Sequence, residues 1–199
     1  MSRNTIRKSL PLFLIALGAA AQTPAERAHA VQYLSETRNG VAAAVQGLSD
    51  AQWNFKPAPD KWSIAQIVEH LAITEDLISK KVLVEIKTAP AGAADRDAKQ
   101  VDATVVAKMT DRTTKYQAPE PIQPTGRWTH AEALQHLLDS RAQTISLVES
   151  TPGLRDHVIS HPAFGPLDGY EWALAAAGHS ARHTQQILEV KADPNFPVK

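Results

Sequence analysis

The chain has 199 residues, of which 43% are apolar and 21% charged, a composition typical of a globular protein of one domain. Lysine plus arginine equals aspartate plus glutamate, 21 of each, so the charge predicts neither nucleic-acid binding nor a basic partner. The absence of cysteine excludes disulfides, thiolate metal ligands and a cysteine nucleophile, so that any metal would need histidine and oxygen ligands.

The first 21 residues are expected to be a signal peptide. Arg3, Arg7 and Lys8 form a positive start, and residues 10–21 form an apolar run that is short for a bilayer span and ends in alanines, which suits cleavage after Ala21. An uncleaved anchor or an ordinary amphipathic start are the alternatives. Removing these three basic residues from 21 leaves 18 against 21 acidic ones, a net charge of −3. The sequence predicts a periplasmic or secreted protein with no stable membrane insertion.

Apolar residues at helical spacing predict four long helices and one shorter helix in the remaining residues, 22–199, which are expected to form a single domain. The long helices are expected over residues 24–48, from Ser63 to Ile86, from Thr129 to about residue 150, and from Asp168 to Ala192, and the shorter one over residues 99–112. Capping boxes mark three of the starts, at Ser63 with Gln66, Thr129 with Glu132 and Asp168 with Glu171.

Proline and glycine place loops between these helices, over residues 49–61, 89–98, 118–126 and 151–166. Within the first loop, Trp53 and Phe55 are expected to fold back onto the end of the bundle. No stretch alternates polar and apolar residues for long enough to predict a sheet. The predicted fold is all-α, an antiparallel four-helix bundle with one extra short helix in a crossover.

Residues 62–71 and 128–137 resemble each other. In both, a tryptophan precedes a hydroxyl cap, and a histidine and a leucine follow at the same distance. A duplicated helix pair with pseudo-twofold symmetry would explain the likeness. Similar capping rules at two unrelated helix starts would explain it as well, and the sequence leaves both explanations open.

His179 and His183 are the first candidates for a functional site. They lie four residues apart on the apolar side of the last predicted helix, where Trp172 and Ile187 fall on the same stripe. Two such imidazoles either pack in the core or bind a metal.

A third ligand would come from another helix, and His70 and His136 are the histidines on apolar stripes. The remaining histidines lie near helix starts or in loops and are expected at the surface: His29, His130, His157 and His161.

Charged and polar neighbours of these histidines have two interpretations each. Arg182 and Gln186 flank the pair, and Arg182 is expected to be solvated, with binding of an anionic substrate as the alternative. Glu69 and Glu75 lie close to His70 and are expected to form salt bridges on the helix surface. The alternative is that one of them orients an imidazole or acts as a base.

Several motifs in their order along the chain resemble the DinB-like superfamily, also called DinB/YfiT. They are a tryptophan- and proline-rich entry over residues 53–63 that leads to Glu69-His70-Leu71, a loop over residues 161–167, and His179-x-x-x-His183 followed by Gln186-Ile187. The resemblance covers most of the chain, from Trp53 to Val190.

This resemblance implies a four-helix bundle that binds one divalent metal ion through His70, His179 and His183. Zinc is the first expectation, with nickel, iron or manganese as alternatives. His136 matches no ligand position of the family. It is expected to support a ligand or to pack in the core, with a fourth ligand as the remaining option.

Characterised relatives use the metal to activate a small thiol for transfer or isomerisation. Because the thiols concerned are mainly cytoplasmic, the predicted export makes metal-activated water as plausible as a thiol. The first functional hypothesis is therefore a metal-dependent transferase or hydrolase with a small-molecule substrate. A non-catalytic periplasmic protein that binds a metal or a small ligand is the second, and a bundle whose histidines merely pack is the third. A homodimer is expected, since apolar bundle faces commonly pair.

Overall fold

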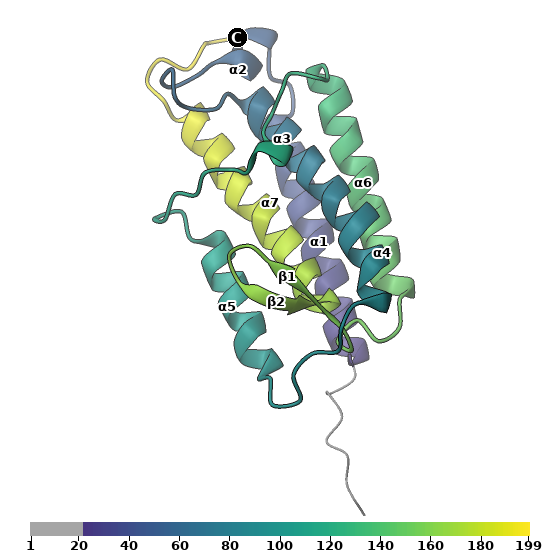
Figure 1. Ribbon diagram of the computed structural model, residues 1–199. Helices are drawn as coiled ribbons and strands as arrows, with labels where there is room; N and C mark the ends of the chain where they lie inside the picture. The colour runs from purple at the N-terminus through teal and green to yellow at the C-terminus, as the bar shows by residue number, and fades with distance from the viewer. Residues whose placement is uncertain (1–21) are drawn as a thin grey trace, which may run out of the picture.

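The computed structural model describes residues 22–199, so the predicted signal peptide lies outside the described residues. Four long helical segments dominate it (Figure 1), which confirms the all-α four-helix bundle. They are α1 (Pro24–Val45), α3 (Ile64–Asp76), α6 (His130–Ser150) and α7 (Gly169–Lys191). Among the described residues, no helix is both long enough and apolar enough to cross a membrane.

Each of the four long helices begins with a capping box, in which a side chain and a backbone N–H three residues apart bond reciprocally. The N-cap residues are Thr23, Ser63, Thr129 and Asp168. All four starts were predicted, and so were three of the capping boxes, the exception being the one at Thr23. The boxes satisfy backbone N–H groups that a helix start otherwise leaves unpaired, and so fix where each helix begins.

Three predicted segments differ from the structure in detail. The loop over residues 49–61 contains a short helix, α2 (Asp50–Asn54), because Ser49 and Gln52 form a further capping box. Trp53 in this helix is buried, and Phe55 packs edge-on against Phe196, which confirms that both cover the end of the bundle.

The predicted helix from Ser63 to Ile86 is not uniform. After α3 it continues as a π-helical turn, η1 (Leu77–Val82), followed by α4 (Leu83–Glu85) and the 3₁₀ turn η2 (Ile86–Thr88). A π turn inserts one residue into the helical repeat, and the apolar spacing does not reveal so small a shift.

The expectation of no strands is wrong for the connection between α6 and α7. There β1 (Val158–His161) pairs antiparallel with β2 (Gly165–Asp168), and Gly165 adopts a φ of 72°. The indole Nε1 of Trp172 donates a hydrogen bond of 3.2 Å to the carbonyl of Ile159 and so ties the hairpin to α7. Strands of four residues are too short to produce a recognisable alternation.

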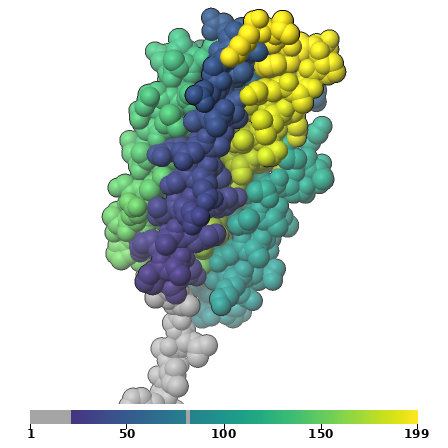
Figure 2. All heavy atoms as spheres, turned by 180° about the vertical axis from the view of Figure 1, so that it is seen from behind, coloured from purple at the N-terminus to yellow at the C-terminus, as the bar shows by residue number. Residues whose placement is uncertain are grey.

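The predicted antiparallel arrangement holds for α1 with α6 and for α3 with α7, but the helices that pack most extensively run in the same direction, α1 with α7 and α3 with α6 (Figure 1). Seen from behind, α1 lies between α6 and α7 (Figure 2). The shorter helix α5 (Ala98–Thr110) makes this possible, because it packs along α7 and leads the chain back toward the end where α6 begins. The segment after α5, which includes the 3₁₀ turn η3 (Glu120–Ile122), then crosses over α7 and α3 (Figure 1).

The core consists of two apolar clusters separated by a polar layer. One cluster includes Leu34 and Trp172, and the other includes Ile67 and Ile187. Between them each long helix contributes a buried polar side chain. These residues, the polar layer, are Thr37, Glu75, Arg141, Thr144 and Ser180.

Gly178 allows α5 to approach α7 closely. A Cβ atom there would lie 3.0 Å from Cγ and 3.1 Å from Cβ of Met109. Gly178→Ala gains about 1 kcal/mol of helix propensity but incurs about 1–3 kcal/mol of overpacking. We therefore expect urea unfolding to show a net loss of about 1 kcal/mol. Met109→Ala should cost less in the Gly178→Ala background than alone, and a stabilising Gly178→Ala would contradict this packing.

Candidate metal centre

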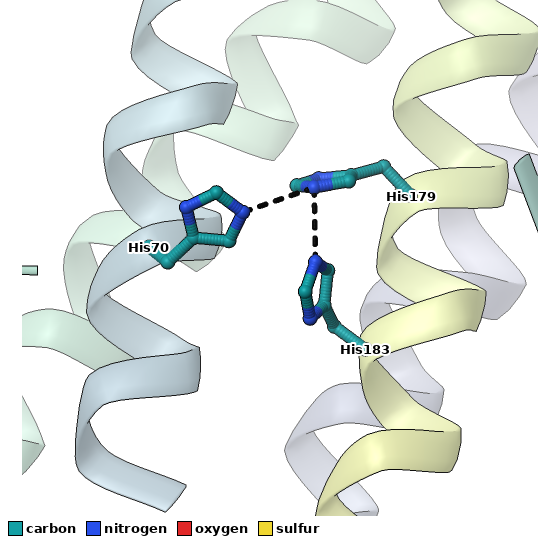
Figure 3. Close-up of side chains that lie close together, drawn as sticks. All are labelled: His70, His179 and His183. Atoms are coloured by element: carbon teal, nitrogen blue, oxygen red, sulfur yellow. Dashed lines mark hydrogen bonds between the residues drawn. The ribbon is translucent and has the colours of Figure 1, made fainter. Parts of the chain in front are cut away.

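Three histidines from two helices converge on one point (Figure 3). His70 projects from α3, and His179 and His183 project from successive turns of α7. Nε2 of His179 lies 3.1 Å from Nε2 of His70 and 3.1 Å from Nε2 of His183. The structure thus brings together all three residues that the family resemblance identified, and we refer to them as the histidine cluster.

The outer nitrogens of two of these rings have oxygen partners. Nδ1 of His70 lies 2.7 Å from the carbonyl oxygen of Ile122, and Nδ1 of His183 lies 2.8 Å from Oε1 of Gln186. Because a carbonyl or amide oxygen only accepts, each Nδ1 carries the proton and donates it. Nε2 of both rings is therefore left with a free lone pair directed into the cluster, as in a metal-binding histidine.

The donor set fits a divalent cation better than it fits an empty core. A neutral His179 has at most one proton on Nε2 and can donate it to only one of the two neighbouring nitrogens. The other contact then places two lone pairs 3.1 Å apart. Tetrahedral zinc with Zn–N bonds of 2.0–2.1 Å separates its nitrogen ligands by about 3.3 Å, which is close to the 3.1 Å between His179 and each of its two neighbours.

The electrostatic setting keeps these imidazoles neutral. Burial, followed by the proximity of His70, lowers the pKa of His183 to about 3. Burial and the two other rings lower the pKa of His179 well below its ordinary value, and burial outweighs the Ile122 hydrogen bond in lowering that of His70. Neutral imidazole is the form that binds metal. His70 and His183 are only 3% and 7% exposed, whereas His179 is partly exposed.

His136 lies outside the histidine cluster. Its Nε2 is 2.7 Å from Oδ2 of Asp76, and its ring stacks on Trp128 with centroids 4.4 Å apart. Trp62 also contacts His70, with centroids 4.9 Å apart, but these two rings are tilted by 50° and not stacked. The two similar sequence segments therefore both pair a tryptophan with a histidine, in different geometries. Of these two histidines, only His70 belongs to the histidine cluster.

The surface positions predicted for Glu69 and Glu75 are wrong, since both carboxylates are buried. Glu69 accepts hydrogen bonds from three successive backbone N–H groups, those of residues 125–127, at 3.0, 2.8 and 3.2 Å. Burial raises the pKa of Glu69, but these bonds outweigh burial and hold the pKa below its usual range. Glu75 pairs with Arg141 in the polar layer.

Arg182 is not solvated as predicted but is 8% exposed. Its Nη1 donates to the carbonyl of Asp111, and its Nη2 donates to the carbonyl of Thr114 at 2.6 Å. Both ends of the guanidinium are thus occupied by backbone. Gln186 does flank the site and bonds His183.

Among the histidines expected at the surface, His29 is exposed and the others are partly buried. His161 packs against Phe164 and Trp172 with centroids 4.7 and 4.8 Å away, and burial lowers its pKa to about 4. His130 stacks on Trp53 at 5.0 Å. None of these rings belongs to the histidine cluster.

Comparisons with known proteins agree with this architecture. The chain matches the model of the DinB superfamily over residues 33–187. It is 27% identical over 150 residues to the uncharacterized protein YuaE of Bacillus subtilis (strain 168), a match that covers 74% of this chain and 88% of YuaE.

Two solved structures share the fold. YfiT from Bacillus subtilis, described as a probable metal-dependent hydrolase with an unusual four-helix bundle topology, is similar with a TM-score of 0.57 and 14% identity, over 89% of this chain and 93% of YfiT. TT2238, a four-helix bundle protein, gives a TM-score of 0.52 and 18% identity over 82% of this chain and 98% of its own. Because the family model covers most of the helical bundle, the chain belongs to the DinB superfamily.

Proposed function

We propose that His70, His179 and His183 hold one divalent metal ion, and that the protein is a metal-dependent enzyme acting on a small molecule. The observation that carries the proposal is the convergence of three Nε2 atoms, two of them on rings whose outer nitrogen donates to an oxygen. The description of the structural relative YfiT as a probable metal-dependent hydrolase supports it.

When bound, a divalent ion supplies a Lewis acid that lowers the pKa of a bound water or thiol. The chain itself provides three neutral ligands, so none of the charge of the ion is neutralised by a carboxylate. Since the sequence has no cysteine, a thiol would have to come from the substrate. His179 is the one member of the histidine cluster that is not fully buried, so we expect a small molecule to approach the ion from its side. Zinc is the ion we favour, because three histidines and an open position are typical of catalytic zinc sites.

We propose further that the protein is exported after cleavage behind Ala21. The support is the positive start and the short apolar run of the first 21 residues. Cell fractionation together with the intact mass of the purified protein tests this proposal. A mature chain that starts at Gln22 in the periplasm or medium is expected, and a full-length chain in the cytoplasm would contradict it.

The metal proposal is tested by elemental mass spectrometry of the untagged protein. We expect about one equivalent of metal in the wild type and almost none in His179→Ala/His183→Ala, because two of three ligands are lost. His136→Ala is the matched control and should retain the metal, since His136 lies outside the histidine cluster.

A wild type without metal, even after zinc and nickel are offered, would overturn the proposal and leave histidines that only pack. Turnover in a screen of small electrophiles, with and without thiols, then separates an enzyme from a protein that only binds the ion.

A further inference from the structure

The segment between α5 and α6 crosses the helices that carry the histidine cluster (Figure 1). We call residues 111–127 the strap. Each end of the strap is fixed by a side chain that directly precedes a histidine of the cluster, Glu69 before His70 and Arg182 before His183.

At the α6 end, the strap contacts the cluster itself. The carbonyl of Ile122 accepts the Nδ1–H of His70 at 2.7 Å and so sets which nitrogen of that ring faces inward. Three to five residues further on, the carboxylate of Glu69 binds the backbone N–H groups of residues 125–127. This turn includes Gly126 in the left-handed region, with a φ of 74°. The Glu69 carboxylate therefore fixes the position from which the Ile122 carbonyl reaches His70.

At the α5 end, Arg182 fixes the strap in place. Its two terminal nitrogens bind the carbonyls of Asp111 and Thr114, and its guanidinium lies 5.6 Å from the ring centroid of Tyr116. The rigid fork of a guanidinium suits two separate carbonyls, which a lysine ammonium cannot hold in the same way. No carboxylate forms an ion pair with Arg182 in the described part of the chain.

Apart from these anchors and the ion pair of Arg112 with Glu189 on α7, the strap has little packing of its own. Residues 113–117 are all exposed, and Tyr116 is 62% exposed. A segment with few buried apolar contacts depends on its polar anchors for its position and opens with little free energy when they are lost.

We propose that Arg182 and Glu69 are positioning residues of the histidine cluster, which act through the strap. By fixing the strap they keep the Ile122 carbonyl on Nδ1 of His70, and hence keep Nε2 of His70 directed inward. Coupling between two sites is reciprocal, so an ion bound at the histidine cluster in turn stabilises the strap in the position described here. The inference rests on the proposed metal site, because the coupling requires an ion at the histidines.

The test combines zinc affinity, measured by competition with a chelating dye, and backbone amide exchange of the strap with and without zinc. We expect Arg182→Leu and Glu69→Gln to weaken zinc binding by about 10-fold, the lower end of the range for groups that support a metal ligand. Exchange at residues 113–124 should become faster in both variants, and zinc should slow it in the wild type. The zinc affinity and the exchange rates of Arg182→Lys should lie between those of the wild type and Arg182→Leu, because an ammonium replaces only part of the guanidinium fork.

Arg38→Leu is the control, since within residues 22–199 the one hydrogen bond of the Arg38 side chain is to the adjacent Asn39. If the wild type binds zinc but the Arg182 and Glu69 variants bind as tightly as Arg38→Leu, the inference is wrong and the metal site stands. A wild type that binds no zinc overturns the proposed function and the coupling with it. If Arg182→Leu does not fold, Arg182→Lys and Glu69→Gln still decide between these outcomes.

Discussion

Arg141→Leu is expected to lower the free energy of unfolding by about 3–5 kcal/mol, because it leaves a buried carboxylate without its partner. Arg141 is 1% exposed, and its guanidinium binds both carboxylate oxygens of Glu75, at 2.8 and 2.6 Å. The remaining N–H groups of Arg141 bind oxygens of Leu34, Thr37, Ala176 and Ser180. Urea unfolding of the metal-free protein near pH 7 measures the loss.

A double variant separates the contribution of the Arg141–Glu75 ion pair from the cost of leaving the Glu75 carboxylate buried without a partner. Arg141→Met/Glu75→Leu removes both charges and should recover most of the loss, since a buried ion pair is often no more stabilising than apolar residues of similar volume. Arg38→Leu, at a partly exposed position, should change stability by less than about 0.5 kcal/mol. A loss below about 1 kcal/mol for Arg141→Leu alone would show that this carboxylate is rehydrated.

The polar layer also bears on the histidine cluster. Arg141 contacts α1, α3 and α7 at once, through Leu34, Glu75 and Ser180. Ser180 directly follows His179, and Glu75 lies little more than one helical turn beyond His70. A buried network of satisfied hydrogen bonds is directional and specifies one arrangement of the helices that it joins. The layer therefore fixes the register at which His70 of α3 meets His179 of α7.

Much of the fold is readable from local sequence. Helical spacing of apolar residues and the capping boxes at Ser63, Thr129 and Asp168 locate three long helices to within one residue at their starts. The spacing of His179 and His183 supplies a pair on one face of a helix. The choice of His70 over His136 as the third member came from the family resemblance, since both histidines lie on apolar stripes.

The remaining features depend on contacts between distant residues. Glu69 and Arg182 resemble ordinary charged helix residues in sequence, and their partners are backbone groups of the strap, far along the chain. Contacts of this kind cannot be predicted from residue types, because almost every residue carries the same backbone N–H and carbonyl groups. The parallel pairing of α3 with α6 likewise depends on the return path that α5 provides, and loop composition does not specify that path.

Lowering the pH from 7 to 5 is expected to destabilise the metal-free protein through the histidine cluster. In the unfolded chain a histidine takes up a proton near pH 6.5, whereas in the folded chain the pKa of His183 is about 3. Below about pH 6.5 the unfolded state therefore binds more protons, and the free energy of unfolding falls as the pH falls, until about pH 3. One pKa unit corresponds to 1.36 kcal/mol, so His183 alone removes about 2 kcal/mol between pH 6.5 and 5. His179 acts in the same direction.

The comparison that isolates this effect is the wild type against His179→Leu/His183→Leu, both without metal. Glu171, whose pKa burial and Asp168 raise to about 7, acts in the opposite direction, but it is present in both proteins and cancels in the difference. The lowered pKa of Glu69 affects stability only below about pH 4.5, outside the window. The leucine variant should be as stable as the wild type or more stable at pH 7, and its stability should fall less between pH 7 and 5. Equal slopes for the two proteins would mean that the histidines take up protons as readily in the folded chain as in the unfolded chain, and that the cluster is not the neutral, cation-ready set of ligands inferred here.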